Sequence, residues 1–200
     1  MKRPSLRGLL SRAGRAVERA SPTAAAIWRS ARDPMIADAL RRGRLRIMAS
    51  ELTTTVGRAT RLAEVGVRCV PELVLVDGTT DDGTRVHAAF AVEHAIFAPR
   101  GGKELTLAIE PEALDRAAWA RQAAAGIAAT IAARLGIEVL PSSESLEVAV
   151  VREGPGLLRV DLRALGRSRN PVGDMLPIQS VHIVDNAIEL ALPPLFGKPA

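Results

Sequence analysis

Aromatic residues are scarce in this chain of 200 residues, which contains three Phe, two Trp and no Tyr. Proteins that bind single-stranded nucleic acids stack the bases on aromatic side chains, so this scarcity argues against that class of protein. The hydrophobic content of 48% is nevertheless sufficient for a folded core. Val, Leu, Ile and Ala must supply most of the volume of that core.

Cysteine is almost absent as well, because Cys69 is the only one. A single cysteine excludes an intramolecular disulfide and a cysteine-based metal site within one chain, and we expect it to be a small buried apolar residue. The longest mostly apolar run covers residues 123–133, which is shorter than the roughly 18 residues that a membrane-spanning helix needs. Arginines interrupt any secretory signal near the start, while an Arg-rich, acid-poor start also fits an organellar transit peptide.

Positive charge is concentrated in the first part of the chain. The first 46 residues contain twelve Arg or Lys and three acidic residues, whereas the rest contain fifteen basic and nineteen acidic residues. The formal net charge of +5 therefore combines a strongly basic arm with a mildly acidic body. Such an asymmetry predicts that the arm binds an anionic surface.

The arm begins with an amphipathic pattern. Apolar residues recur at three- and four-residue spacing, which places them on one face of a helix with arginines on the other. The candidate membrane-binding residues are Leu6, Arg7, Leu9, Leu10, Arg12, Arg15, Val17 and Arg19. Such a helix buries its apolar face at the lipid headgroup boundary, while its arginines attract anionic lipid. Two other interpretations stay open: a helix packed on the body with solvated arginines, and an arm that neutralises nucleic-acid phosphates.

The rest of the chain shows strand patterns on both sides of one long helix. Residues 65–75 are interpreted as one extended run, and a dense turn signal at 77–83 precedes a second strand with alternating apolar residues over 86–96. A helix of about 25 residues is expected from Pro111 to Leu135, with Gly136 after its end. Further strands are expected at 105–109, 146–150 and 158–162, and in a hairpin over 178–192 that turns at Asp185-Asn186.

This order of elements predicts an α+β fold with a largely antiparallel, curved sheet and one long helix, preceded by short N-terminal helices. The expected parts are a basic amphipathic helical arm at 1–44, an α+β body at 45–192 and an irregular tail at 193–200.

No residue pattern in the chain is typical of an active site. His87 and His94 are expected on opposite faces of one strand, and His182 stands alone, so no histidine-based zinc pattern is present. The acidic residues at 77–82 lack the spacing of a calcium loop, and the glycine pair and lysine at 101–103 lack the context of a phosphate-binding loop. We therefore expect a non-catalytic protein that needs no cofactor and no metal.

The closing strands resemble those of a known family. From Asp174 to Leu192 the chain reads DMLPIQSVHIVDNAIELAL, which is similar in pattern to the end of bacterial tubular lipid-binding domains of the LmeA phospholipid-binding type. The resemblance extends from about Leu45 and implies curved antiparallel strands around a long helix, enclosing an apolar groove. The groove residues that it implies are Val67, Leu73, Leu75, Phe90, Val92, Leu107, Ile109, Val148 and Val160. Ordinary core packing is the alternative for each of them.

Together these patterns predict a peripheral membrane-associated, lipid-binding protein anchored by its basic arm. The main alternative is a structural or adaptor subunit whose arm docks on an acidic partner, and nucleic acid is the least favoured partner. We expect a cytoplasmic protein at the membrane periphery, with export left open because proteins of the similar family are usually exported.

Overall fold

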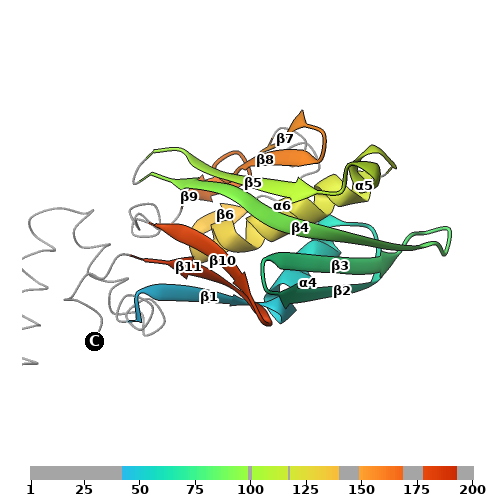
Figure 1. Ribbon diagram of the computed structural model, residues 1–200, viewed down its shortest axis with the longest axis horizontal. Helices are drawn as coiled ribbons and strands as arrows, with labels where there is room; N and C mark the ends of the chain where they lie inside the picture. Colours follow the sequence, from blue (N-terminus) through green and yellow to red (C-terminus); the bar gives the residue numbers. More distant parts are fainter. Residues whose placement is uncertain (1–41, 99–100, 117, 140–148, 169–177, 193–200) are drawn as a thin grey trace, which may run out of the picture.

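The computed structural model describes residues 42–98, 101–116, 118–139, 149–168 and 178–192 (Figure 1). These residues form an α+β structure with antiparallel strand pairing, as the sequence predicts. The strands are β1 (Arg44–Met48), β2 (Ala63–Val70), β3 (Leu73–Thr79), β4 (Arg85–Phe97), β5 (Lys103–Ile109), β6 (Ile137–Val139), β7 (Val150–Gly154), β8 (Leu157–Asp161), β9 (Gly166–Ser168), β10 (Ser180–Val184) and β11 (Ala187–Ala191). The helices are α4 (Ala49–Ala59), α5 (Pro111–Arg116) and α6 (Ala118–Arg134).

The strands of the described part form a six-stranded sheet, a three-stranded sheet and a small two-stranded sheet. Their orders are β2-β3-β4-β5-β8-β7, β1-β11-β10 and β6-β9. Helices α4 and α6 lie behind the six-stranded sheet in Figure 1. The β10–β11 hairpin meets the β2–β3 hairpin through two backbone hydrogen bonds, from Asn186 N–H to the Cys69 carbonyl and from Glu72 N–H to the Ile183 carbonyl, each 3.0 Å long. The two larger sheets are therefore joined at this corner.

The central part of helix α6 is buried on every side. Ala120 and all residues from Ala123 to Ala132 are buried, which is the pattern of a helix in the middle of a core rather than on a surface. Its many alanines allow neighbouring elements to approach closely, and Phe90, Leu107 and other side chains of the strands fill the remaining volume. The long helix is predicted correctly over 111–116 and 118–134, and Gly136, with φ +74°, follows its end as expected.

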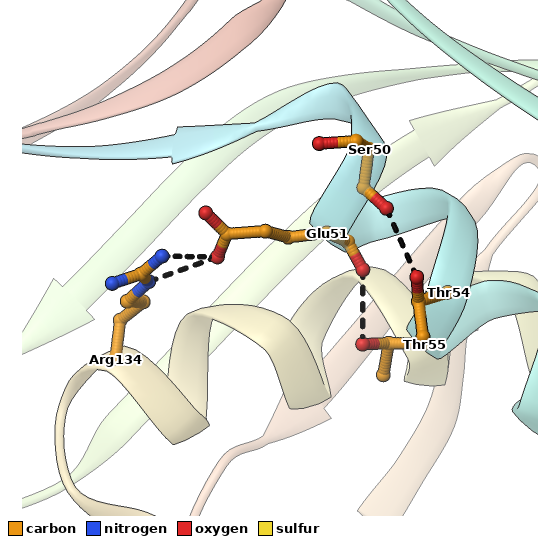
Figure 2. Close-up of polar contacts among 5 residues, drawn as sticks. All are labelled: Ser50, Glu51, Thr54, Thr55 and Arg134. Carbon is orange, nitrogen blue, oxygen red and sulfur yellow. Dashed lines mark hydrogen bonds and ion pairs between the residues drawn. The ribbon is translucent and has the colours of Figure 1, made fainter.

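Helix α4, which the sequence pattern did not predict, packs against α6. A Cβ atom on Gly126 would lie only 2.9 Å from the Val56 Cα atom, so the two backbones cross in close contact. The Glu51 carboxylate on α4 forms an ion pair with the Arg134 guanidinium at the end of α6, and the hydroxyls of Thr54 and Thr55 donate to carbonyls one turn earlier in α4 (Figure 2). These bonds occupy threonine hydroxyls within a helix, where β-branched residues are otherwise unfavourable.

The interpretation of residues 65–75 as one extended run is wrong. A two-residue turn at Pro71 and Glu72 divides this stretch into β2 and β3, and Glu72 has a φ of +70°. The turn reverses the direction of the chain and changes which residues face inward. Val74 and Val76 are consequently buried, whereas Leu73 is exposed.

The prediction that His87 and His94 face opposite sides of β4 is also wrong. The pairing of β4 with β5 shifts register between Val92 and His94, which marks a β-bulge. The extra residue restores both histidines to the solvent-facing side, where they are exposed. The same shift buries Phe97 and leaves Ile96 exposed.

Candidate anionic-surface site

The outer face of the three-stranded sheet carries polar and basic side chains. Alternation along β1 buries Leu45 and Ile47 and exposes Arg44, Arg46 and Met48. The buried residues join the hydrophobic core, so the pleat of the strand directs its basic side chains outward. Strand β1 therefore adds basic charge to the surface directly after the arm.

Two cross-strand rows lie on this outer face because β1 and β10 both pair with β11. The first row is Arg44, Ala191 and Ser180, and the second row is Arg46, Glu189 and His182. The rows bring together residues from the first and last parts of the described chain. Residues opposite each other across an antiparallel pair are close enough for their side chains to interact.

The two arginines converge on one carboxylate. Arg44 Nη1 lies 3.6 Å from Glu189 Oε2, and Arg46 Nε lies 3.6 Å from Glu189 Oε1. The Arg46 Nη2 group also donates a hydrogen bond to the Asp185 carbonyl at 3.2 Å. The arginine side chains are 57% and 51% exposed, and ion pairs of such exposed groups contribute only about 0–1 kcal/mol. An anion from solution can therefore compete for them at low cost.

Strand β10 adds a hydroxyl and an imidazole to the same face. Ser180 Oγ and His182 Nε2 are 2.7 Å apart, which is a hydrogen bond between side chains two residues apart on one face of the strand. His182 is exposed and Ser180 is partly exposed. One N–H or O–H of this pair is used in the bond between them, and the other is left to donate from β10, across β11 from the arginines of β1.

The candidate membrane-binding residues of the arm lie outside the described residues. This applies to Leu6, Arg7, Leu9, Leu10, Arg12, Arg15, Val17 and Arg19. Of the basic residues among the first 46, the structure describes Arg42, Arg44 and Arg46, and all three are exposed. The amphipathic helix at the start of the arm stays a prediction.

The residues that the family resemblance assigns to a lipid groove are distributed over both faces of the six-stranded sheet. Those in the buried core are Val67, Phe90, Leu107, Ile109 and Val160, and Val92 packs against that core while partly buried. Leu73 and Leu75 lie on the outer face, opposite Ala91 and Ala89, and Val148 lies outside the described residues. The core members share one cluster with the alanines of α6.

A polar pocket of about 330 Å³ lies in the six-stranded sheet, beside the start of β2 and the turn between β3 and β4. Its lining residues are Glu64, Asp77, Gly78, Thr79, Arg85, Val86 and His87. The Asp77 carboxylate lies over Gly66, where a Cβ atom would be 2.1 Å from Asp77 Oδ2, and it also forms an exposed ion pair with Arg68 at 3.6 Å. Among the described residues, no group of three or more His, Cys, Asp or Glu side chains could hold a metal ion.

The acidic turn between β3 and β4 has a structural explanation. The Asp82 carboxylate accepts hydrogen bonds from the Thr80 hydroxyl and from the Thr84 N–H. The hydrogen bond from Thr80, followed by those from Thr84, lowers the pKa of the Asp82 carboxyl because these bonds favour its charged form. Gly83 in the same turn has a φ of +84°, which glycine adopts without strain.

Cys69 is buried in the core, as the sequence predicts. Burial raises the pKa of its thiol because the charged thiolate loses its hydration there. The nucleophilic form of a cysteine is the thiolate. A buried thiol with a raised pKa is typical of a structural residue.

Comparisons with protein-family models, with curated proteins and with solved structures find no match to this chain. Within the described ranges, no helix combines the length and the apolar composition needed to span a bilayer.

Sequence reasoning missed the site on the three-stranded sheet. The β10–β11 part of the site had a detectable signal in the sequence. A two-residue turn at Asp185-Asn186 pairs Val184 with Ala187, and the same register then pairs His182 with Glu189. The β1 part of the site had no such signal, since no local sequence pattern indicates that β1 pairs with β11. The charge pattern groups Arg44 and Arg46 with the basic first 46 residues, although both belong to a folded strand.

Proposed function

We propose that this chain is a non-catalytic, peripheral membrane-associated protein that binds anionic lipid through its basic arm and the outer face of β1. The observation that supports this proposal is the exposure of Arg42, Arg44 and Arg46, with Met48 exposed to 41% on the same strand. Each arginine held near an anionic bilayer contributes about 1 kcal/mol to binding. The basic segment thus continues from the arm into a strand whose orientation is fixed.

We place the lipid outside the sheets rather than between them. Phe90, Leu107 and Val160 are each no more than 1% exposed, and they belong to the same buried cluster as α6. Protein interiors are close-packed, so an acyl chain there would have to displace these side chains. This packing favours attachment to the surface of a bilayer over enclosure of a lipid.

Co-sedimentation of the full chain with vesicles tests the proposal. We expect binding to phosphatidylcholine vesicles that contain phosphatidylserine, and weak binding to vesicles without it. Arg44→Gln/Arg46→Gln should lower the affinity by about 5- to 30-fold, because two arginines at about 1 kcal/mol each leave the anionic surface. The matched control is Arg61→Gln/Arg121→Gln, which removes the same charge from exposed positions outside the three-stranded sheet.

Two results would contradict the proposal. One is that the full chain does not bind vesicles of either composition. The other is an equal loss of affinity in both double variants, which would indicate a response to net charge without a defined surface. A chain that starts at residue 42 separates the contribution of the arm from that of β1, provided that circular dichroism shows it to be folded.

The alternative function is that of a structural or adaptor subunit docked on an acidic protein. The observation that favours it is the position of β1 at the edge of its sheet as described, where a partner strand can pair with its backbone. A specific partner that is retained by the full chain and lost with Arg44→Gln/Arg46→Gln would support this function, if vesicles are not bound.

A further inference from the structure

The two cross-strand rows of the three-stranded sheet surround one short side chain. Ala191 lies between Arg44 and Ser180 in the first row, next to Glu189 of the second row. Adjacent strands are about 4.8 Å apart, so Arg44 and Ser180 start about 10 Å from each other. Ala191 contributes only a methyl group between these longer side chains and is itself partly exposed.

The donors on this face are suited to a group with several anionic oxygens. The guanidinium groups of Arg44 and Arg46 donate several N–H bonds each from β1. The Ser180 hydroxyl and the His182 ring approach from β10, and the 2.7 Å hydrogen bond between them fixes one relative to the other. Because the donors lie on two sides of a central strand, such a site favours ligands with enough anionic oxygens to accept hydrogen bonds from both sides at once.

Glu189 occupies the centre of this arrangement. Its two carboxylate oxygens each lie 3.6 Å from an arginine nitrogen, which is longer than the usual distance of 2.7–2.9 Å for charge-assisted hydrogen bonds. The arginines are thus oriented toward one point without being tightly bound there. The carboxylate marks the position where an external anion would find both guanidinium groups.

We propose that this face, formed by Arg44, Arg46, Ser180 and His182, recognises the phosphomonoester of an anionic lipid headgroup. The proposal rests on the proposed membrane function and specifies which lipid is preferred. A phosphomonoester carries a charge of about −1.5 to −2 and three terminal oxygens, whereas the diester of most phospholipids offers only two terminal oxygens and one charge. The donors of β1 bind one side of the phosphate, and those of β10 bind the other.

The test compares two vesicle compositions with the full chain. Phosphatidylcholine vesicles contain either phosphatidic acid or phosphatidylserine, with the proportions adjusted to give equal surface potential. We expect about 5- to 10-fold tighter binding to phosphatidic acid, because each charge-assisted hydrogen bond adds to the attraction shared by both vesicles. Equal affinity for the two vesicles would overturn the inference while leaving the proposed function standing, and failure to bind either would overturn both.

Variants on β10 separate specific recognition of the phosphomonoester from general electrostatic attraction to an anionic vesicle. Ser180→Ala/His182→Gln should reduce the affinity for phosphatidic acid to the level of phosphatidylserine and leave phosphatidylserine binding within twofold. The control Ser50→Ala/His94→Gln makes the same chemical changes at exposed positions elsewhere and should retain the preference. An equal loss for both lipids in the β10 variant, with an unchanged circular dichroism spectrum, would contradict a specific phosphate site.

Glu189→Gln provides an opposite prediction. Removing the competing carboxylate charge while keeping its shape should raise the affinity for phosphatidic acid by about threefold or more. A decrease would mean that Glu189 is needed to hold the arginines and that the site is not directed at anions.

A last experiment identifies the source of the phosphate. Soluble glycerol phosphate is titrated into the chain without vesicles, and the His182 ring signals are followed by NMR. Shifts with vesicles of phosphatidic acid, and only weak millimolar binding of glycerol phosphate, support a lipid headgroup. Tight binding of the soluble compound would overturn the assignment to lipid.

Discussion

The six-stranded and the three-stranded sheet both bury aliphatic side chains on their inner faces, but their outer faces differ. Across the six-stranded sheet, the outward row Leu73, Ala91, Ala108 and Leu157 is apolar, and the next outward row, His94, Thr106, Arg159 and Val151, is mostly polar. Across the three-stranded sheet, two neighbouring outward rows bring arginine, glutamate, histidine and serine together around Ala191, and the third row, Met48, Ala187 and Val184, is apolar. Core packing determines the inner faces alone, so the outer faces carry the information about partners.

The largest expected effect comes from the inner face of the six-stranded sheet. Phe90 is fully buried, and Phe90→Ala should lower the free energy of unfolding by about 3–5 kcal/mol because it leaves a cavity. Urea denaturation at 25 °C measures the change. Ile96→Ala, at a position that is 43% exposed on the same strand, should change stability by less than about 0.5 kcal/mol. Similar losses in both variants would show that the packing around β4 is not as described.

The crossing of α4 and α6 should give the next largest effect. Gly126→Val introduces a side chain whose first carbon would lie 2.9 Å from the Val56 Cα atom, and overpacking of this kind costs about 1–3 kcal/mol. Thermal unfolding compares this variant with Gly154→Val, since a Cβ atom at Gly154 would meet nothing within 4 Å. The crossing would be in doubt if Gly126→Val were as stable as the original chain.

The ion pair between the two helices should contribute less. Glu51→Gln removes the charge that faces Arg134 (Figure 2), and the side chains of the pair are 34% and 21% exposed, respectively. We expect a loss of about 0.5–1 kcal/mol, diminishing with added salt because salt screens exposed charges. Chemical denaturation at two salt concentrations checks this. A loss that is independent of salt would point to packing of the Glu51 side chain instead.

The smallest effect on stability should come from the outer face of the three-stranded sheet. Arg44→Gln/Arg46→Gln should change the free energy of unfolding by less than about 1 kcal/mol, because both arginines are more than half exposed. The same variant should have the largest effect on vesicle binding. Stability and vesicle binding are measured on one preparation of this variant. If both fall together, the outer face of the three-stranded sheet does not act in binding independently of the fold.

Local patterns predicted the strands and turns whose signals are strong. Alternation over Leu105 to Ile109 and over Leu158 to Leu162 is confirmed by burial, and the turn at Asp185-Asn186 is confirmed by its pairing and by the φ of +61° at Asn186. Each of these features is contained within a few residues, so the sequence carries enough information to specify it.

Other features could not be predicted because tertiary contacts override the local preference. The three consecutive threonines from Thr53 to Thr55 favour a strand, yet α4 is a helix because Leu52 and Val56 are buried against its neighbours. The turn at Pro71-Glu72 contains neither Gly nor Asn, and Glu72 adopts a positive φ that such residues rarely show. The site on β1 depends on pairing between residues at opposite ends of the body, which no window of sequence contains.

The pairing of β1 with β11 has a consequence for the order of folding. Arg46 and the carbonyl of Asp185 that it contacts are 139 residues apart. Contacts of such separation form late, because a long loop must close before they bring any gain. During synthesis the basic strand is therefore made early but acquires its partners only when the last hairpin has emerged. Recognition at this surface would thus require that the β10–β11 hairpin has already paired with β1.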